Sequence, residues 1–133
     1  MNLTDFLLAR IAEDETVALE SKSPGDGAWV EETRASGFGD IRASNGHAVM
    51  YDDSGNRADR DHILRWDPAR VLRECAAKRR IVEAVVKLRQ IAEIEDPFGN
   101  RGNWDQFDVV HDVLRVFAAV HSGHADYIKG WRF

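Results

Sequence analysis

The 133-residue sequence has one cysteine, three prolines and no long apolar run. Because Cys75 stands alone, the chain can form neither an internal disulfide nor a metal site built from several thiolates. Its apolar stretches are a few residues long, far short of the ~20 that cross a bilayer, and no secretory signal opens it. These absences predict a cytoplasmic protein that does not bind membranes.

What remains has the composition of a globular domain. Apolar residues make up 44% of the chain and charged residues 31%, which argues against long disordered or low-complexity segments. The length predicts a single domain spanning residues 1–133. The net charge of -5 is unevenly distributed, because residues 65–89 hold eight basic side chains against three acidic ones. This basic segment can attract either the acidic N-terminal segment or a partner.

The spacing of apolar residues predicts an α+β fold. Residues 1–20 are expected to form an N-terminal helix, and residues 28–51 an antiparallel β-hairpin or three-stranded sheet. Residues 58–95 are expected to form the central helices, and residues 103–133 are expected to form a C-terminal helical part. We expect the small sheet to pack on two long helices plus the N-terminal helix. The predicted buried side of the first helix comprises Leu3, Phe6, Leu7, Ile11 and Ala18.

The start of the longest helix is predicted at Asp67 and Pro68. An aspartate can accept a hydrogen bond from a free N–H of the first helical turn, and proline suits the first helical position. Substitution of Asp67 by Asn or Ser is expected to preserve most of this capping. The core stripe predicted downstream comprises Val71, Leu72, Cys75, Val82, Val85 and Val86, widened by Ile81, Leu88, Ile91 and Ala92.

Two apolar stripes on the last long helix predict that it is buried on more than one side. One stripe comprises Phe107, Val110, Leu114 and Phe117, and the other comprises Val109, Val113, Val116 and Val120.

Imidazole and carboxylate groups near the C-terminus suggest one candidate site. Zinc prefers ligands of these types, and the candidate ligands are His111, His121, His124 and Asp126. A metal-dependent enzyme that uses them is one alternative. Histidines that cap the helix or lie at the surface are favoured over a metal site, because a protonated histidine near a helix C-terminus is stabilised by the helix dipole.

Basic side chains of the central helix suggest a second candidate site. The candidate phosphate contacts are Arg70, Arg73, Lys78, Arg79, Arg80 and Lys87. A nucleic-acid-binding module that uses this helix is a second alternative, since lysine and arginine supply most phosphate contacts. The acidic composition and the lack of a recognition motif favour a solvated or internally paired face.

No pattern in the sequence identifies an enzyme. The segment 37–39 lacks the strand and helix context of a dinucleotide-binding fingerprint, and no phosphate-binding loop with its lysine is present. Cys75 lies on the apolar stripe and is expected to be a small core residue. We therefore predict no catalytic residue and no cofactor.

A specific pattern covers residues 62–74 (HILRWDPARVLRE) and residues 77–81 (AKRRI). This pattern resembles the core signature of a small family known only as a domain of unknown function, numbered six-two-two-one. An N-terminal Phe-Leu-x-Ala-Arg-x-x-Glu-Asp-Glu pattern, Trp29 and a His-Ala-Asp-Tyr-x-x-x-Trp-Arg ending are similar too. Where members often have histidine before Asp-Pro, this chain has Trp66. The resemblance implies an origin in actinobacteria or their phages and supplies no activity.

The favoured hypothesis is a non-catalytic accessory protein of a phage or mobile element. We expect it to bind a protein partner, either a host factor or a second copy of itself, in the cytoplasm of a bacterial host. The absence of a catalytic motif and the family context support this hypothesis.

Overall fold

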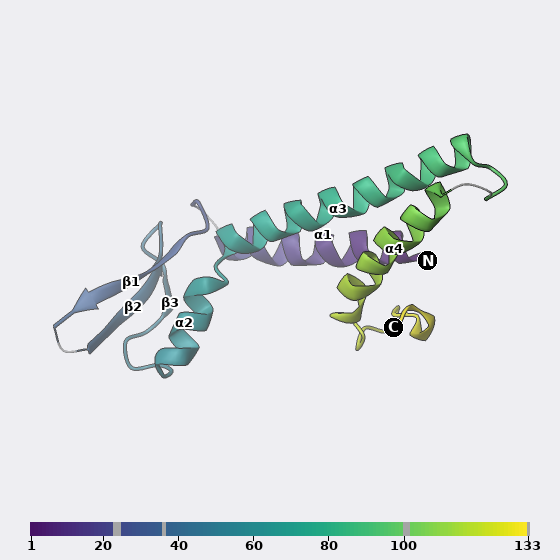
Figure 1. Cartoon of the computed structure of the whole chain (residues 1–133). Coiled ribbons are helices and arrows are strands. Elements are labelled where there is room, and N and C mark those ends of the chain that lie inside the picture. Colours follow the sequence, from purple (N-terminus) through teal and green to yellow (C-terminus); the bar gives the residue numbers. More distant parts are fainter. Residues whose placement is uncertain (23–24, 36, 100–101, 133) are drawn as a thin grey trace. The chain divides into compact units, whose positions relative to one another are not determined.

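A computed structural model describes residues 1–22, 25–35, 37–99 and 102–132 (Figure 1). In chain order its elements are α1 (Leu3–Lys22), β1 (Trp29–Arg34), β2 (Gly37–Ala43), β3 (Ala48–Met50), α2 (Arg57–Arg65), α3 (Pro68–Glu95), α4 (Asn103–Ala119) and the 3-10 helix η1 (Lys129–Trp131). The three strands form one antiparallel sheet. The predicted α+β class is therefore confirmed, with a three-stranded sheet.

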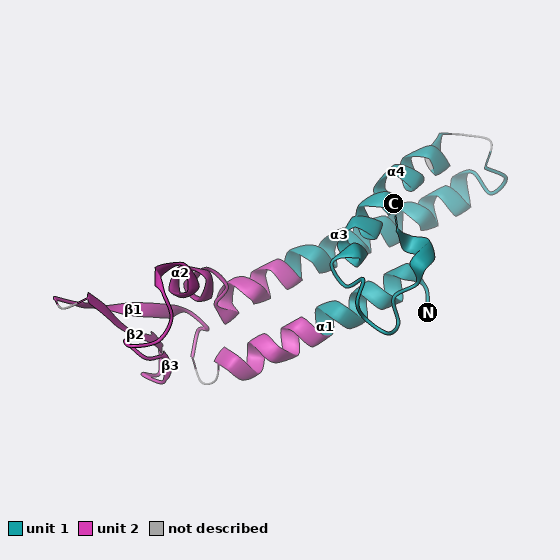
Figure 2. Cartoon of the chain, turned by 90° about the horizontal axis from the view of Figure 1, so that it is seen from below, with its two compact units in different colours: residues 1–12, 76–133 teal, residues 13–75 magenta. Residues whose placement is uncertain are grey.

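The described residues divide into two compact units (Figure 2). Unit 1 comprises residues 1–12 and 76–133, and unit 2 comprises residues 13–75. Each boundary falls inside a helix, so α1 and α3 contribute residues to both units. Whether the chain behaves as one domain stays a prediction.

Unit 2 contains the sheet, in the order β1-β2-β3. Trp29 lies opposite Ala43 at one end of the β1–β2 pair, and Arg34 lies opposite Gly37 at the other. A short turn then leads from β2 into β3, where Gly46 adopts a φ of 86° that favours glycine. The helix α2 contacts β1, so this short helix covers part of the sheet.

A close approach of two strands explains one glycine of β2. The register of the β1–β2 pair shifts between Glu31 and Thr33. At this irregularity a Cβ atom on Gly39 would overlap the backbone of Glu32. Gly39 therefore has a structural role, because only a residue without a side chain lets the strands approach so closely.

The predicted start of α3 is confirmed. Pro68 is the first helical residue, and Oδ1 of Asp67 accepts a hydrogen bond from the backbone N–H of Arg70 at 2.9 Å. The second carboxylate oxygen, Oδ2, accepts a hydrogen bond from the N–H of Trp29 at 3.3 Å. The side chain of Asp67 thus caps the helix and also contacts the first residue of β1.

Unit 1 has a core made by three helices. The buried residues from α1 include Phe6 and Leu7, which the apolar spacing predicts. The predicted stripe of α3 is confirmed at its centre, and α4 contributes residues that face the same core. The other buried apolar residues of this core are Leu3, Ile11, Val82, Val85, Ala92, Leu114 and Ala118. In unit 2, Ala18 and Cys75 are buried as expected.

The predicted burial of the second stripe of α4 is wrong. Val109 and Val120 are 70% and 80% exposed, and Val113 and Val116 are exposed as well. On α3, Ile81 and Ile91 are also more exposed than the predicted stripe implies. Among the described residues, no helix is both long and apolar enough to cross a membrane.

Candidate functional site

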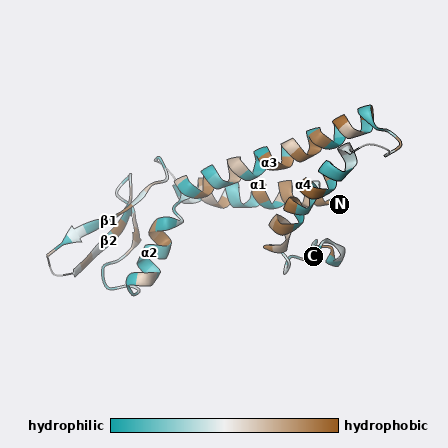
Figure 3. Ribbon diagram, in the orientation of Figure 1, coloured by the Kyte–Doolittle hydropathy of each residue, from teal (hydrophilic) through white to brown (hydrophobic). Residues whose placement is uncertain are grey.

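An apolar groove in unit 1 is the strongest candidate site. Its volume is about 420 Å³. Its lining is entirely aliphatic and comes from α3 and α4: Ile81, Ala84, Val85, Leu88, Val110 and Val113. Figure 3 shows hydrophobic residues recurring along the later part of α3 and along α4. Because α4 follows α3 through a short connection, the chain builds both walls of this groove from one helical hairpin.

The groove continues into an exposed row of valines on α4, which we call the valine ridge: Val109, Val113, Val116 and Val120. Successive members are four, three and four residues apart, which is the spacing of the apolar seam of a coiled coil. The buried residues Leu114 and Ala118 lie on the opposite side of the same helix. The helix therefore carries one apolar face toward its own core and a second apolar face toward solvent.

Charged residues of opposite sign border the groove. On α3, Arg80 and Lys87 are exposed, and Arg80 lies one helical turn before Ala84 of the groove. On α4, Asp105 and Asp112 are exposed and lie beside the valine ridge, on the side away from α3. The α3 rim of the groove is thus basic and its α4 rim acidic.

The six basic residues predicted to contact nucleic acid all lie on α3, in different surroundings. The Arg70 Nε donates a hydrogen bond to Glu74 at 2.8 Å, and its guanidinium stacks over Trp66 at 4.3 Å. Lys78 and Arg79 are partly buried. The exposed members are Arg73 in unit 2 and the two rim residues Arg80 and Lys87 in unit 1.

The C-terminal histidines lie around one aromatic ring. The centre of the Phe6 ring is 6.2 Å from that of His121 and 5.9 Å from that of His124. Tyr127 and Trp131 contact the same ring. These contacts form an aromatic cluster that attaches the C-terminal segment to α1.

Each predicted metal ligand has another neighbour. Nη1 of the buried Arg10 donates to Nε2 of His124, and Asp126 lies 3.8 Å from Nδ1 of the same ring. His111 contacts the ring of Phe107 instead. Across the described part of the chain, no three His, Cys, Asp or Glu side chains gather in a way that could hold a metal ion.

Comparison with known proteins gives a family. The model of a family of unknown function, DUF6221, matches residues 1–133. The chain belongs to this family. The resemblance predicted from the sequence is thereby confirmed at the level of the family. No curated protein and no solved structure matched the chain.

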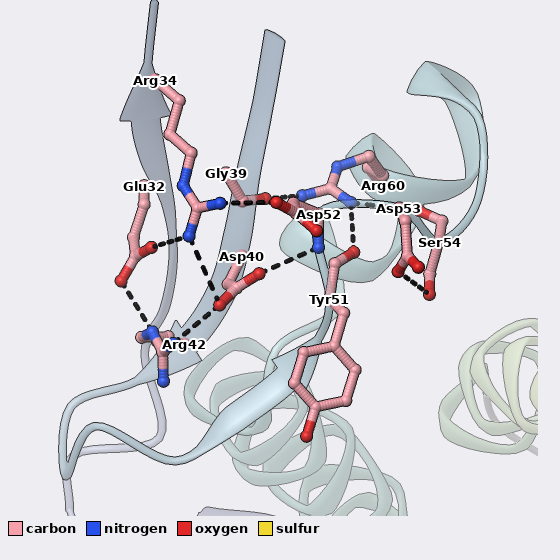
Figure 4. A network of polar contacts seen from close by, with 10 residues as sticks. All are labelled: Glu32, Arg34, Gly39, Asp40, Arg42, Tyr51, Asp52, Asp53, Ser54 and Arg60. Atoms are coloured by element: carbon pink, nitrogen blue, oxygen red, sulfur yellow. Dashed lines mark hydrogen bonds and ion pairs between the residues drawn. The ribbon is translucent and has the colours of Figure 1, made fainter. Parts of the chain in front are cut away.

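In this family member, unit 2 contains a polar network that the sequence did not reveal (Figure 4). Arg60 has no exposed surface, and its guanidinium donates to the backbone carbonyl oxygens of Tyr51 and Ser54 at 3.0 Å and to that of Gly39. Its Nε donates to Oε2 of Glu31 at 2.9 Å. Arg60 therefore fastens α2 to the sheet.

Asp40 organises the other half of this network. One carboxylate oxygen accepts from Nη2 of Arg42 at 2.6 Å and lies 3.7 Å from Arg34. The other oxygen accepts from the backbone N–H of Asp52 at 2.9 Å. These contacts explain how the sheet and the segment before α2 are held together.

Hydrogen bonds and charge shift the pKa of a carboxylate in this network. Hydrogen bonds from Arg57 and Arg60 lower the pKa of Glu31 from its ordinary value of 4.5 to about 2. Arg57 donates to both carboxylate oxygens, at 2.7 and 2.9 Å. Glu31 is therefore ionised at neutral pH and acts as a fixed anion between two arginines.

Proposed function

We propose that this chain is a non-catalytic accessory protein that binds a protein partner through the groove between α3 and α4. The observation that carries the proposal is the valine ridge, which is exposed along its full length. A contiguous apolar surface of this kind on a folded protein is typical of an interaction site. Groove and ridge together suit an amphipathic helix, which places an apolar stripe in a groove between two helices.

Energetics support the same proposal. Full burial of a valine or leucine side chain contributes roughly 1.5–3 kcal/mol. A partner that buried the valine ridge and the groove lining would therefore gain a large favourable contribution to the free energy of binding. The opposite charges of the two rims then add orientation, because charged residues beside an apolar seam determine which partner binds and in which direction. A protein partner can use both features at once.

The family context supports the finer form of this proposal. We place the protein among the accessory proteins of actinobacterial phages or mobile elements, acting in the cytoplasm of the host. The partner is then a host factor or a second copy of the chain. The lack of a catalytic motif in the sequence is in keeping with this role.

The proposal is tested by cross-linking from a defined position. A photo-reactive amino acid replaces Val113 in the groove, and in a matched control it replaces Asp108, an exposed residue of the same helix outside the groove. We expect a protein cross-link in the producing cell from position 113 and none from position 108. Cross-links absent from position 113, or equally strong from both positions, would contradict the proposal.

The two alternatives stay predictions. A nucleic-acid-binding module would rely chiefly on the exposed basic residues Arg73, Arg80 and Lys87. Its affinity would fall steeply with salt, because release of counterions drives phosphate binding. A metal-dependent enzyme would need His111, His121, His124 and Asp126 to bind a stoichiometric metal ion.

A further inference from the structure

We infer that the occupant of the groove is a second copy of this chain, and that the two copies form a symmetric dimer of α3–α4 hairpins. The inference rests on the proposed function, because it names the partner of that same groove. The observation behind it is the charge of the two rims. The groove has a basic rim on α3 and an acidic rim on α4, so one groove is complementary to a copy of itself.

The symmetry of such a pair follows from the charges. Two identical surfaces that face each other are related by a two-fold axis lying in their interface. If that axis runs along the groove, α3 of one copy lies over α4 of the other. Each basic rim then meets an acidic rim, and the contact occurs twice. An axis across the groove would instead place α3 over α3 and bring like charges together, which is unfavourable.

The level of the residues along the groove indicates which charges meet. Ala84 and Leu88 of α3 line the same groove as Val110 and Val113 of α4. Lys87 precedes Leu88 by one residue, and Asp112 precedes Val113 by one. A two-fold axis along the groove leaves the position of each residue along the groove unchanged. Lys87 of each copy therefore faces Asp112 of the other.

Asp112 remains available for this contact. Within its own helix it pairs with Arg115 at 3.1 Å, yet its side chain is 56% exposed. Lys87 is exposed on α3. Between these rims, the valine ridge of each copy would pack against Ile81, Ala84 and Leu88 of the other. The geometry is that of a four-helix bundle, in which apolar residues fill the centre and charges border the seam.

The first experiment measures the mass of the purified full-length chain in solution. A chain of 15.0 kDa is expected to sediment as a dimer of about twice that mass at micromolar concentration. Lys87→Glu places a carboxylate opposite Asp112 at both rims, and Asp112→Lys places an ammonium group opposite Lys87 at both. Each variant alone should weaken dimerisation at least about tenfold.

Mixing the two variants gives the decisive result. In a mixed dimer, one rim pairs the wild-type Lys87 of one copy with the wild-type Asp112 of the other. The second rim pairs the introduced glutamate with the introduced lysine, so opposite charges meet there too. An equimolar mixture of Lys87→Glu and Asp112→Lys should therefore associate more tightly than either variant alone. The matched control is Glu20→Lys, which makes the same charge change at an exposed residue of unit 2, outside the α3–α4 hairpin, and should leave the dissociation constant unchanged. Circular dichroism verifies that each variant keeps its helices.

Three results would overturn the inference: a monomer at all concentrations tested, a dimer indifferent to both variants, or a mixture that associates no better than its components. A cross-link from position 113 to a different protein would keep the proposed function and eliminate the second copy as occupant. No cross-link from position 113 in cells, together with a monomer in solution, would eliminate both.

Discussion

Arg60 lies wholly buried with its Nε 2.9 Å from Oε2 of Glu31, while Arg57 reaches the same carboxylate from a partly exposed position. The two arginines thus share one anion and differ in burial. Arg60 also donates to three backbone carbonyl groups. We expect the buried arginine to be the more important of the two for stability.

Replacement of each arginine by methionine tests this expectation. Arg60→Met removes a buried partner and leaves carbonyl oxygens unsatisfied, so it should lower the free energy of unfolding by ~3–5 kcal/mol. Arg57→Met removes a solvent-screened ion pair with the same Glu31 and should cost much less. Urea denaturation followed by circular dichroism measures both. Equal losses for the two variants would show that burial is not what distinguishes them.

The low pKa of Glu31 predicts a pH dependence of stability. Because the pKa is about 2 in the folded protein and 4.5 ordinarily, the ionised carboxylate stabilises the fold above about pH 4.5, and this contribution is lost as the pH falls toward 2. In Glu31→Gln the contribution is absent at every pH. Urea titrations at pH 7, 4.5 and 2 should therefore show the wild type losing more stability on acidification than the variant. Parallel pH profiles would refute a role for Glu31 in this pH dependence.

Gly39→Ala should destabilise the sheet. The added Cβ atom would overlap the backbone of Glu32, so the two strands would have to separate, at a cost of about 1–3 kcal/mol. Gly123→Ala is the matched control, because a Cβ atom there has no neighbour within 4 Å. Thermal melting should show a lower Tm for the first variant only. An unchanged Tm for Gly39→Ala would mean that the two strands can move apart without any loss of stability.

Asp67→Ala should lower the Tm by roughly 2–8 °C, since the loss of a cap costs about 0.5–2 kcal/mol. The structure also revises the expectation for the conservative variants. Both carboxylate oxygens accept hydrogen bonds, from Arg70 and from Trp29, whereas asparagine has only one acceptor oxygen. Asp67→Asn and Asp67→Ser should therefore recover only part of the loss. Full recovery with either would show that the contact with Trp29 contributes nothing.

The periodicity of the sequence predicted the helices and strands of this fold well. It did not predict which face of each helix is covered by other parts of the chain. The buried side of α1 is as expected, because its apolar residues form one stripe. The helix α4 has two stripes of similar spacing, and spacing alone cannot distinguish a core face from an unpartnered one. The error over the valine ridge therefore falls on the surface that we propose for partner binding.

The buried arginine was missed for a different reason. Arg60 sits in a short, strongly polar helix, where composition predicts exposure. Its burial depends on Glu31 of β1, on the carbonyl group of Gly39 in β2, and on those of Tyr51 and Ser54 in the segment before α2. Only tertiary structure brings those acceptors together. Arg80 and Lys87, by contrast, were singled out in the sequence as candidate phosphate contacts, although the apolar groove beside them was not predicted.

The contacts of Phe6 have a consequence for synthesis on the ribosome. This residue, near the start of the chain, packs against His121, His124, Tyr127 and Trp131, so unit 1 joins the first twelve residues to the last fifty-eight. Unit 2 is a continuous stretch, residues 13–75, and its chain is complete much earlier. Nascent chains arrested near residue 110 should therefore contain a protease-resistant unit 2, whereas their N-terminal residues should stay accessible to protease until the aromatic residues beyond position 120 have been synthesised.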